Sequence, residues 1–217
     1  MLKSIKILFL LLGFGFCLSS CFKNLTKPTV AYFNDFENGE DTGFIVLNAN
    51  GTLPKPIIDS FNKGKVMGRF WQSRLEFDYP TLPKHNLVEV ELILNTHGYW
   101  EGNKRIGGLP DLWNIAMDGG LIYQTTFSNS VEKQSYPDWF DIGATPNPPR
   151  GNAWETDLPG VCALKDVKGG TVSYKITFSR PHTGDTIHLT INDVLHNSIC
   201  DKSWSIDNLK ITTYDIQ

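Results

Sequence analysis

Apolar and polar residues alternate along several short stretches of the chain, and Gly, Pro and Asn residues separate these stretches. Successive side chains of a strand point to opposite faces, so such alternation indicates strands with one buried face. No stretch after the first twenty residues has the periodicity of an amphipathic helix. The clearest predicted strands are Leu87–Asn95, Leu112–Met117, Leu121–Phe127, Thr171–Ser179, Thr186–Ile191 and Trp204–Thr212. We therefore expect an all-β domain.

One turn and one long connection stand out between these strands. Asp118-Gly119-Gly120 predicts a β-hairpin, because glycine accepts the positive φ angles of tight turns. Residues 136–160 form the long connection, which is rich in proline but also contains Trp139 and Trp154. Large aromatic residues are uncommon in disordered linkers, so we expect an ordered loop that lies across the domain.

The start of the chain has a different pattern. Lys3 and Lys6 precede the apolar run Ile7–Leu18, which is too short to span a membrane permanently. This order predicts a signal peptide over residues 1–20. The run ends in Leu-Ser-Ser-Cys21, which resembles the bacterial lipobox, in which small residues precede a cysteine that is acylated and becomes the first mature residue. An ordinary signal peptide with a chance cysteine is the alternative.

The lipobox resemblance implies a lipoprotein with a lipidated Cys21, a tether over residues 21–30 and a domain over residues 31–217. Acyl chains such as palmitate, at about 0.8 kcal/mol per buried CH₂, would hold such a protein at a membrane of the cell envelope. No Asp follows Cys21, which argues against retention in the inner membrane, and no acidic run follows it, which argues against surface export. We therefore expect the outer membrane.

Loss of residues 1–20 leaves 197 of the 217 residues, a length that suits one β domain. The same loss lowers the number of Lys and Arg residues from 20 to 18, whereas all 23 Asp and Glu residues remain. The formal charge of the mature chain is therefore −5. Basic residues form no stripe or cluster, and a nucleic-acid partner is not expected.

Of the four cysteines, Cys17 leaves with the signal peptide and Cys21 is the predicted anchor. Cys162 and Cys200 remain, and an even number of cysteines in an oxidising compartment suggests a disulfide. Two separate buried thiols are the alternative.

Short motifs from Lys65 to the end resemble, in their order and spacing, a β-sandwich module of bacterial extracellular and surface proteins. The motifs are Trp100-Glu-Gly-Asn, Pro110-Asp-Leu-Trp, Asp118-Gly-Gly, Thr125-Thr-Phe-Ser-Asn, Tyr136-Pro and Ser203-Trp-Ser-Ile-Asp-Asn-Leu. The resemblance implies a single two-sheet antiparallel β-sandwich of jelly-roll or related type.

A second likeness concerns the two ends of the domain. Asn34–Gly39 and Trp204–Asn208 look like the paired termini of galactose-binding-like jelly rolls and several carbohydrate-binding modules. In those families the first and last strands lie side by side and often share a structural calcium ion. Calcium prefers carboxylate and carbonyl oxygens, so the resemblance implies a site at Asp35, Glu37 and Asp207. Solvated turn residues are the alternative.

Other polar residues give weaker evidence for a catalytic or metal site. Glu101, Asp111 and Asp118 form a second acidic group, and paired carboxylates are what glycoside hydrolysis needs, so a hydrolase stays an alternative. Nucleophile-elbow, His-Glu-x-x-His and phosphate-loop motifs do not occur in the sequence. No pair of histidines has metal-ligand spacing, so zinc is not expected; the histidines are His85, His97, His182, His188 and His196.

Aromatic residues in predicted loops suggest a ligand, because sugar rings stack on Trp and Tyr. The candidates are Tyr99, Trp100, Tyr136, Trp139 and Trp154, although such residues can also cap the open ends of a sandwich. Trp113 and Trp204 fall in predicted strands and are expected in the core. The sequence thus predicts a membrane-anchored module that binds carbohydrate. The alternatives are a structural or adhesive envelope component that contacts other envelope proteins and, less favoured, a glycoside hydrolase.

Overall fold

The computed structural model describes residues 27–48, 50–52, 57–105, 107–141 and 143–216. The predicted signal peptide and Cys21 lie outside the described residues, so both stay predictions. Within the described ranges, no helix is long and apolar enough to cross a membrane. The strands are β1 (Thr29–Asn34), β2 (Phe44–Asn48), β3 (Gly51–Thr52), β4 (Ile58–Phe61), β5 (Gly64–Phe70), β6 (Ser73–Tyr79), β7 (Leu87–Gly98), β8 (Leu112–Met117), β9 (Gly120–Thr126), β10 (Glu155–Pro159), β11 (Lys168–Pro181), β12 (Ile187–Val194) and β13 (Lys202–Tyr214).

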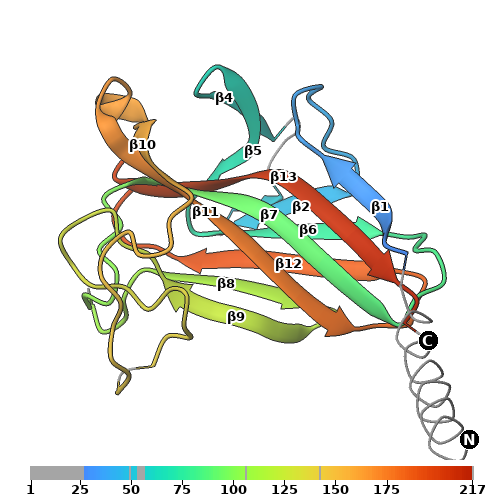
Figure 1. Ribbon diagram of the computed structural model, residues 1–217. Coiled ribbons are helices and arrows are strands. Elements are labelled where there is room, and N and C mark those ends of the chain that lie inside the picture. The colour runs from blue at the N-terminus through green and yellow to red at the C-terminus, as the bar shows by residue number, and fades with distance from the viewer. Residues whose placement is uncertain (1–26, 49, 53–56, 106, 142, 217) are drawn as a thin grey trace, which may run out of the picture.

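These strands form two antiparallel sheets that pack face to face (Figure 1). One sheet has the order β10-β11-β7-β13-β5-β4, with β1 paired to the second half of β13, and the other has the order β3-β2-β6-β12-β8-β9. From β5 to β13, successive strands cross between the sheets except at the β8–β9 hairpin and at β10, as in a jelly roll. The predicted two-sheet sandwich is confirmed, and its first and last strands do lie side by side.

Alternation in the strands places the core between the sheets. In β7, Val88, Val90, Leu92 and Leu94 are fully buried in the core, which leaves the residues between them on the outer face. Trp113 and Trp204 also lie in the core, as predicted from their strand positions. All six predicted strands are present, with ends that differ by no more than three residues.

Local sequence explains the β8–β9 hairpin. Asp118 and Gly119 have φ angles of 50° and 77°, so this turn requires the left-handed region at both positions, and the two strands pair on either side of it. The predicted hairpin is therefore present.

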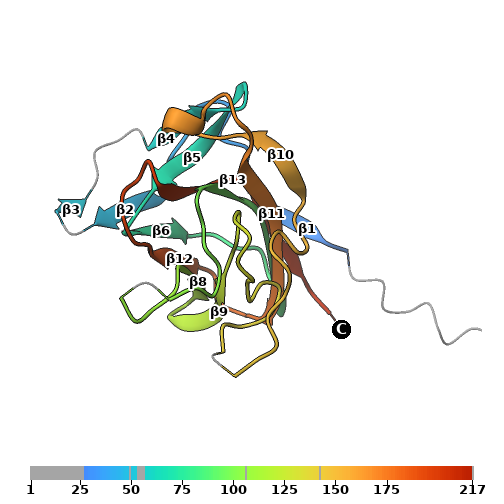
Figure 2. The same ribbon diagram turned by 90° about the vertical axis from the view of Figure 1, so that its left-hand side faces the viewer.

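Residues 136–160 are less irregular than expected, since they include β10, which pairs with β11. Beyond β10, the disulfide Cys162–Cys200 joins a 3₁₀ turn at Cys162–Leu164 to the residues just before β13. The predicted disulfide is thus confirmed. β10 and β4 are the two edge strands of the seven-stranded sheet, and Figure 2 shows them on either side of β13.

Candidate functional site

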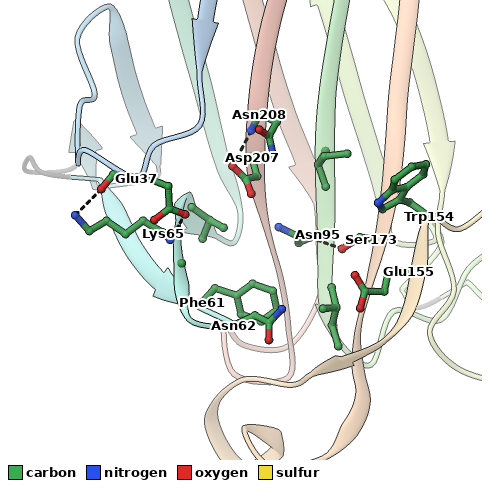
Figure 3. A pocket seen from close by; sticks show the side chains of 14 residues that line it. Glu37, Phe61, Asn62, Lys65, Asn95, Trp154, Glu155, Ser173, Asp207 and Asn208 are labelled. Atoms are coloured by element: carbon green, nitrogen blue, oxygen red, sulfur yellow. Dashed lines mark hydrogen bonds between the residues drawn. The ribbon is translucent and has the colours of Figure 1, made fainter.

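A groove with a volume of about 260 Å³ lies on the outer face of the seven-stranded sheet (Figure 3). Its floor comes from β7, β11 and β13, and its two walls come from the β4–β5 hairpin with the loop after β1 and from β10. The side chains that Figure 3 labels are Glu37, Phe61, Asn62, Lys65, Asn95, Trp154, Glu155, Ser173, Asp207 and Asn208.

The floor of the groove is a row of small polar side chains from three neighbouring strands. Strand register places Ser173 of β11 beside Asn95 of β7, and Asn95 beside Ser205 of β13. The Ser173 hydroxyl donates to the Asn95 Oδ1 atom, and the Asn95 Nδ2 atom donates to the Ser205 Oγ atom at 3.3 Å. All three residues are at most 4% exposed. The Asn95 amide is therefore held in one orientation below the groove.

Next to this row, His97 of β7 extends the network. Its ring nitrogens lie 2.9 Å from the Thr171 hydroxyl and 2.9 Å from the Ser205 hydroxyl, and the Phe61 ring meets its edge at 4.8 Å between centroids. Burial, and to a lesser degree the charge of Arg69, lowers the pKa of His97 to about 3. His97 is therefore neutral at physiological pH and adds no charge beneath the groove.

One wall begins with the loop after β1, which positions Glu37. Asn34 Oδ1 accepts the Phe36 amide at 2.7 Å, and Asp35 Oδ1 accepts the Glu37 amide at 3.2 Å, so two side chains shape this turn. The Glu37 carboxylate accepts the Lys65 amide at 3.0 Å. It also lies against Gly64, where an added Cβ would come within 2.5 Å of the Glu37 Oε1 atom. Glycine at position 64 thus makes room for this carboxylate.

Asp207 enters the groove from a bulge in β13. The register with β7 shifts between Asp207 and Lys210, and Asn208 adopts a φ of 52° there. The Asp207 carboxylate accepts the Asn208 amide at 2.7 Å. Burial, followed by the nearby charges of Glu37 and Asp35, raises the pKa of Asp207 to about 6. The strands therefore bring Asp35, Glu37 and Asp207 close enough for their charges to interact.

The opposite wall carries Trp154 and Glu155, at the start of β10. The Trp154 amide donates to the Ser173 carbonyl at 2.7 Å, which anchors the backbone to the floor strand. The Trp154 side chain remains 68% exposed and lines the groove (Figure 3). Trp154 is thus the predicted ligand-binding aromatic residue that the fold brings to this groove.

The other predicted aromatic residues lie elsewhere. Trp100 is fully buried, donates to the Ser203 carbonyl at 3.0 Å and packs edge-on against Phe127, so its prediction as a ligand-binding residue is wrong. Tyr136 is 9% exposed, belongs to the same core cluster and does not line the groove, so ligand binding by Tyr136 stays a prediction. Trp100 lies just after the end of β7 and Tyr136 lies in the long connection between β9 and β10, and both rings pack against Phe127.

Tyr99 and Trp139 are exposed but do not line the groove. Trp139 meets the ring of Tyr123 edge-on at 6.2 Å. Ligand binding by these two side chains stays a prediction.

The second acidic group does not form an open pair of carboxylates. The Lys202 ammonium is fully buried and lies 2.8 Å from Asp111 Oδ2 and 3.3 Å from Glu101 Oε2. Hydrogen bonds from Lys104 and Lys202 lower the pKa of Glu101. Asp118 lies apart from them and accepts the His188 amide at 3.0 Å. Glu101 and Asp111 therefore stabilise a buried lysine and are not free for acid–base chemistry.

Within the described part of the chain, no three His, Cys, Asp or Glu side chains are arranged to hold a metal ion. Calcium binding by Asp35, Glu37 and Asp207 stays a prediction, supported by their resemblance to paired jelly-roll termini and by their proximity.

Comparisons with known proteins give only distant similarities. No family model matches the chain, and no curated protein matches it. One similar solved structure is a family 35 carbohydrate-binding module from Clostridium thermocellum, with 8% identity over 85% of this chain and 97% of that chain and a TM-score of 0.37. A family GH115 4-O-methyl-α-glucuronidase is similar with 13% identity over 87% of this chain and 18% of that chain, with a TM-score of 0.34.

Latent dimeric PorU from Porphyromonas gingivalis is similar with 9% identity over 66% of this chain and a TM-score of 0.37. This chain spans 10% of the length of that chain. All of these similarities concern the β-sandwich fold, and none is high enough to assign a function.

Proposed function

We propose that the protein binds carbohydrate in the groove above β7, β11 and β13. The observation that carries this proposal is the exposed ring of Trp154 beside a row of fixed polar side chains. A sugar ring stacks its apolar C–H face on an indole, while carboxylates and amides form hydrogen bonds with its hydroxyl groups. A concave site that combines one aromatic surface with a few placed polar groups suits this ligand class.

The fixed floor adds to the expected affinity. Ser173, Asn95 and Ser205 already hydrogen-bond to one another and are buried, so their side chains lose little freedom when a ligand binds. Each flexible side chain that must be ordered on binding costs about 0.5–1.5 kcal/mol, and this groove floor avoids most of that cost.

A glycan panel with Trp154→Ala tests the proposal. Isothermal titration calorimetry and tryptophan fluorescence should detect binding of at least one glycan by the wild-type protein. Loss of the Trp154 ring should weaken that binding about tenfold or more, equivalent to about 1.4 kcal/mol. Phe33→Ala is the control, because the aromatic side chain of Phe33 is 54% exposed but lies outside the groove. Equal effects of both variants, or no glycan bound, would contradict the proposal.

We also propose that acylated Cys21 holds this module at the bacterial outer membrane. The support comes from the sequence, where a basic start, an apolar run and small residues precede Cys21 in the order of a lipobox. Replacement of Cys21 by Ala should move the protein from the membrane fraction to the soluble fraction of the expressing bacterium. Retention of the Cys21→Ala protein in the membrane would argue against the anchor.

Glycoside hydrolysis in the same groove is a second candidate. Asp207, whose pKa is raised to about 6, lines the groove together with Glu37 and Glu155. A carboxyl group with a raised pKa opposite an ionised one is the arrangement that glycosidases use. Release of reducing ends that disappears in Asp207→Asn would favour this candidate over simple binding.

A further inference from the structure

The groove has an unbalanced charge. Three carboxylates line it, from Glu37, Glu155 and Asp207, against a single ammonium group from Lys65. With all four groups ionised, the formal charge of the lining is therefore −2. Glu155 lies beside Trp154 on one wall, Glu37 lies on the opposite wall, and Asp207 comes from the floor strand β13 (Figure 3).

Among the residues that the structure describes, no ion pair offsets the charge of Asp207. The charges of Glu37 and Asp35 repel the Asp207 carboxylate and help to raise its pKa. The ion pairs found in the described ranges include none of the three groove carboxylates. A ligand in the groove therefore meets carboxylates that still lack a positive partner.

Lys65 is poorly placed to attract an anion. Its ammonium group donates to the Glu37 backbone carbonyl at 2.8 Å, and the Lys65 amide binds the Glu37 carboxylate. The one ammonium group in the lining is thus held at a backbone carbonyl, while Asp207 and Glu155 line the groove without a cation of the described residues paired to them.

We propose that the groove selects glycans by charge: it binds sugars that carry a free amino group more tightly than their neutral counterparts and excludes uronic acids and sulfated sugars. This inference rests on the proposed carbohydrate-binding function. A protonated amine gains from the unpaired carboxylates and can also lie against the face of Trp154, where a cation is attracted by the ring. A ligand carboxylate or sulfate would face two unpaired like charges, which is how binding sites reject wrong ligands.

Matched oligosaccharides separate this inference from the proposed function. The four ligands are β-1,4-linked tetramers of glucosamine, N-acetylglucosamine, glucose and a hexuronic acid, titrated calorimetrically at about pH 6.5, above the Asp207 pKa of about 6, so that Asp207 carries its charge. The glucosamine tetramer should bind about tenfold more tightly than the neutral tetramers, and added salt should weaken this preference. The uronic acid tetramer should show no measurable binding.

Glu155→Gln identifies the source of the preference. Glu155 is exposed, so this variant should fold normally while it removes one charge from the groove. It should reduce severalfold the preference for the amine, measured as the ratio of the affinities of this variant for the glucosamine and glucose tetramers. Glu132→Gln makes the same change in net charge outside the groove and should have no effect.

Two kinds of failure are distinguishable. If no tetramer binds and a broader glycan panel is also negative, the proposed function fails and the charge selectivity fails with it. If neutral tetramers bind as tightly as the amine, or the uronic acid tetramer binds best, the charge selectivity is overturned while carbohydrate binding stands. The charge selectivity would also be overturned if Glu155→Gln left the amine preference unchanged while Glu132→Gln abolished it.

Discussion

Replacement of Asp207 by Asn should stabilise the protein at neutral pH. Asp207 lies partly buried in β13, where Glu37 and Asp35 repel its charge and the Asn208 amide is its hydrogen-bond donor. Asparagine has nearly the same shape and keeps an oxygen that accepts the Asn208 amide. The substitution therefore removes the charge and its repulsion while the hydrogen bond remains.

The expected magnitude follows from the pKa of Asp207. Its folded-state pKa of about 6 exceeds the unfolded value of about 3.9, and each pKa unit corresponds to about 1.4 kcal/mol. The upper limit is thus about 3 kcal/mol, and solvent screening of this partly exposed group reduces it to about 1–2 kcal/mol. Because the folded pKa is raised, the protonated carboxyl favours folding below about pH 4, and this contribution is lost as the pH rises through 6.

Urea denaturation of both proteins near pH 4 and near pH 7.5, with a chelator present, measures this effect. The free energies of unfolding should agree near pH 4, where Asp207 is protonated, and Asp207→Asn should be more stable by about 1–2 kcal/mol near pH 7.5. Asp157→Asn is the control, since Asp157 is exposed on β10 and outside the groove, and it should change stability by less than about 0.5 kcal/mol. A destabilised Asp207→Asn, or a difference independent of pH, would refute the reasoning.

Three further predictions concern other parts of the fold. Replacement of Lys202 by Met should destabilise the protein by about 3–5 kcal/mol in urea denaturation, because Asp111 would stay buried without its ammonium partner. Replacement of Cys162 and Cys200 together by Ser should lower the free energy of unfolding by about 4 kcal/mol under oxidising conditions, because the disulfide closes a loop of 38 residues. An unchanged free energy of unfolding would show that the crosslink contributes little. If the terminal carboxylates bind calcium, a chelator should lower the melting temperature by several degrees, and an unchanged midpoint would exclude a stabilising ion.

Local patterns were enough to predict most of the central strands. Alternation in Leu87–Asn95 predicts a strand with one face in the core, because burial of that face is what the pattern reflects. Turn chemistry at Asp118 and Gly119 predicts the hairpin for an equally local reason. The predicted pairing of Cys162 with Cys200 rests on a count, because Cys17 belongs to the predicted signal peptide and Cys21 is the predicted anchor.

Several strands were not predicted, and β10 shows why. Its sequence, Glu155–Pro159, has no alternation that identifies a strand, and its conformation comes from pairing with β11. Trp100 was misplaced for a related reason. Its position after a strand predicts a loop, but only the chain packed around it decides that the ring is buried.

The sequence alone thus predicted the all-β class, the central strands and the β8–β9 hairpin, and it favoured the pairing of Cys162 with Cys200, because each depends on neighbouring residues or on a count. Only the tertiary structure decided the groove. Glu37, Asn95, Trp154 and Asp207 are far apart along the chain and meet because β13 lies beside β7 and the walls rise on either side. Strand pairing is non-local, so no local pattern carries the information that these side chains share one site.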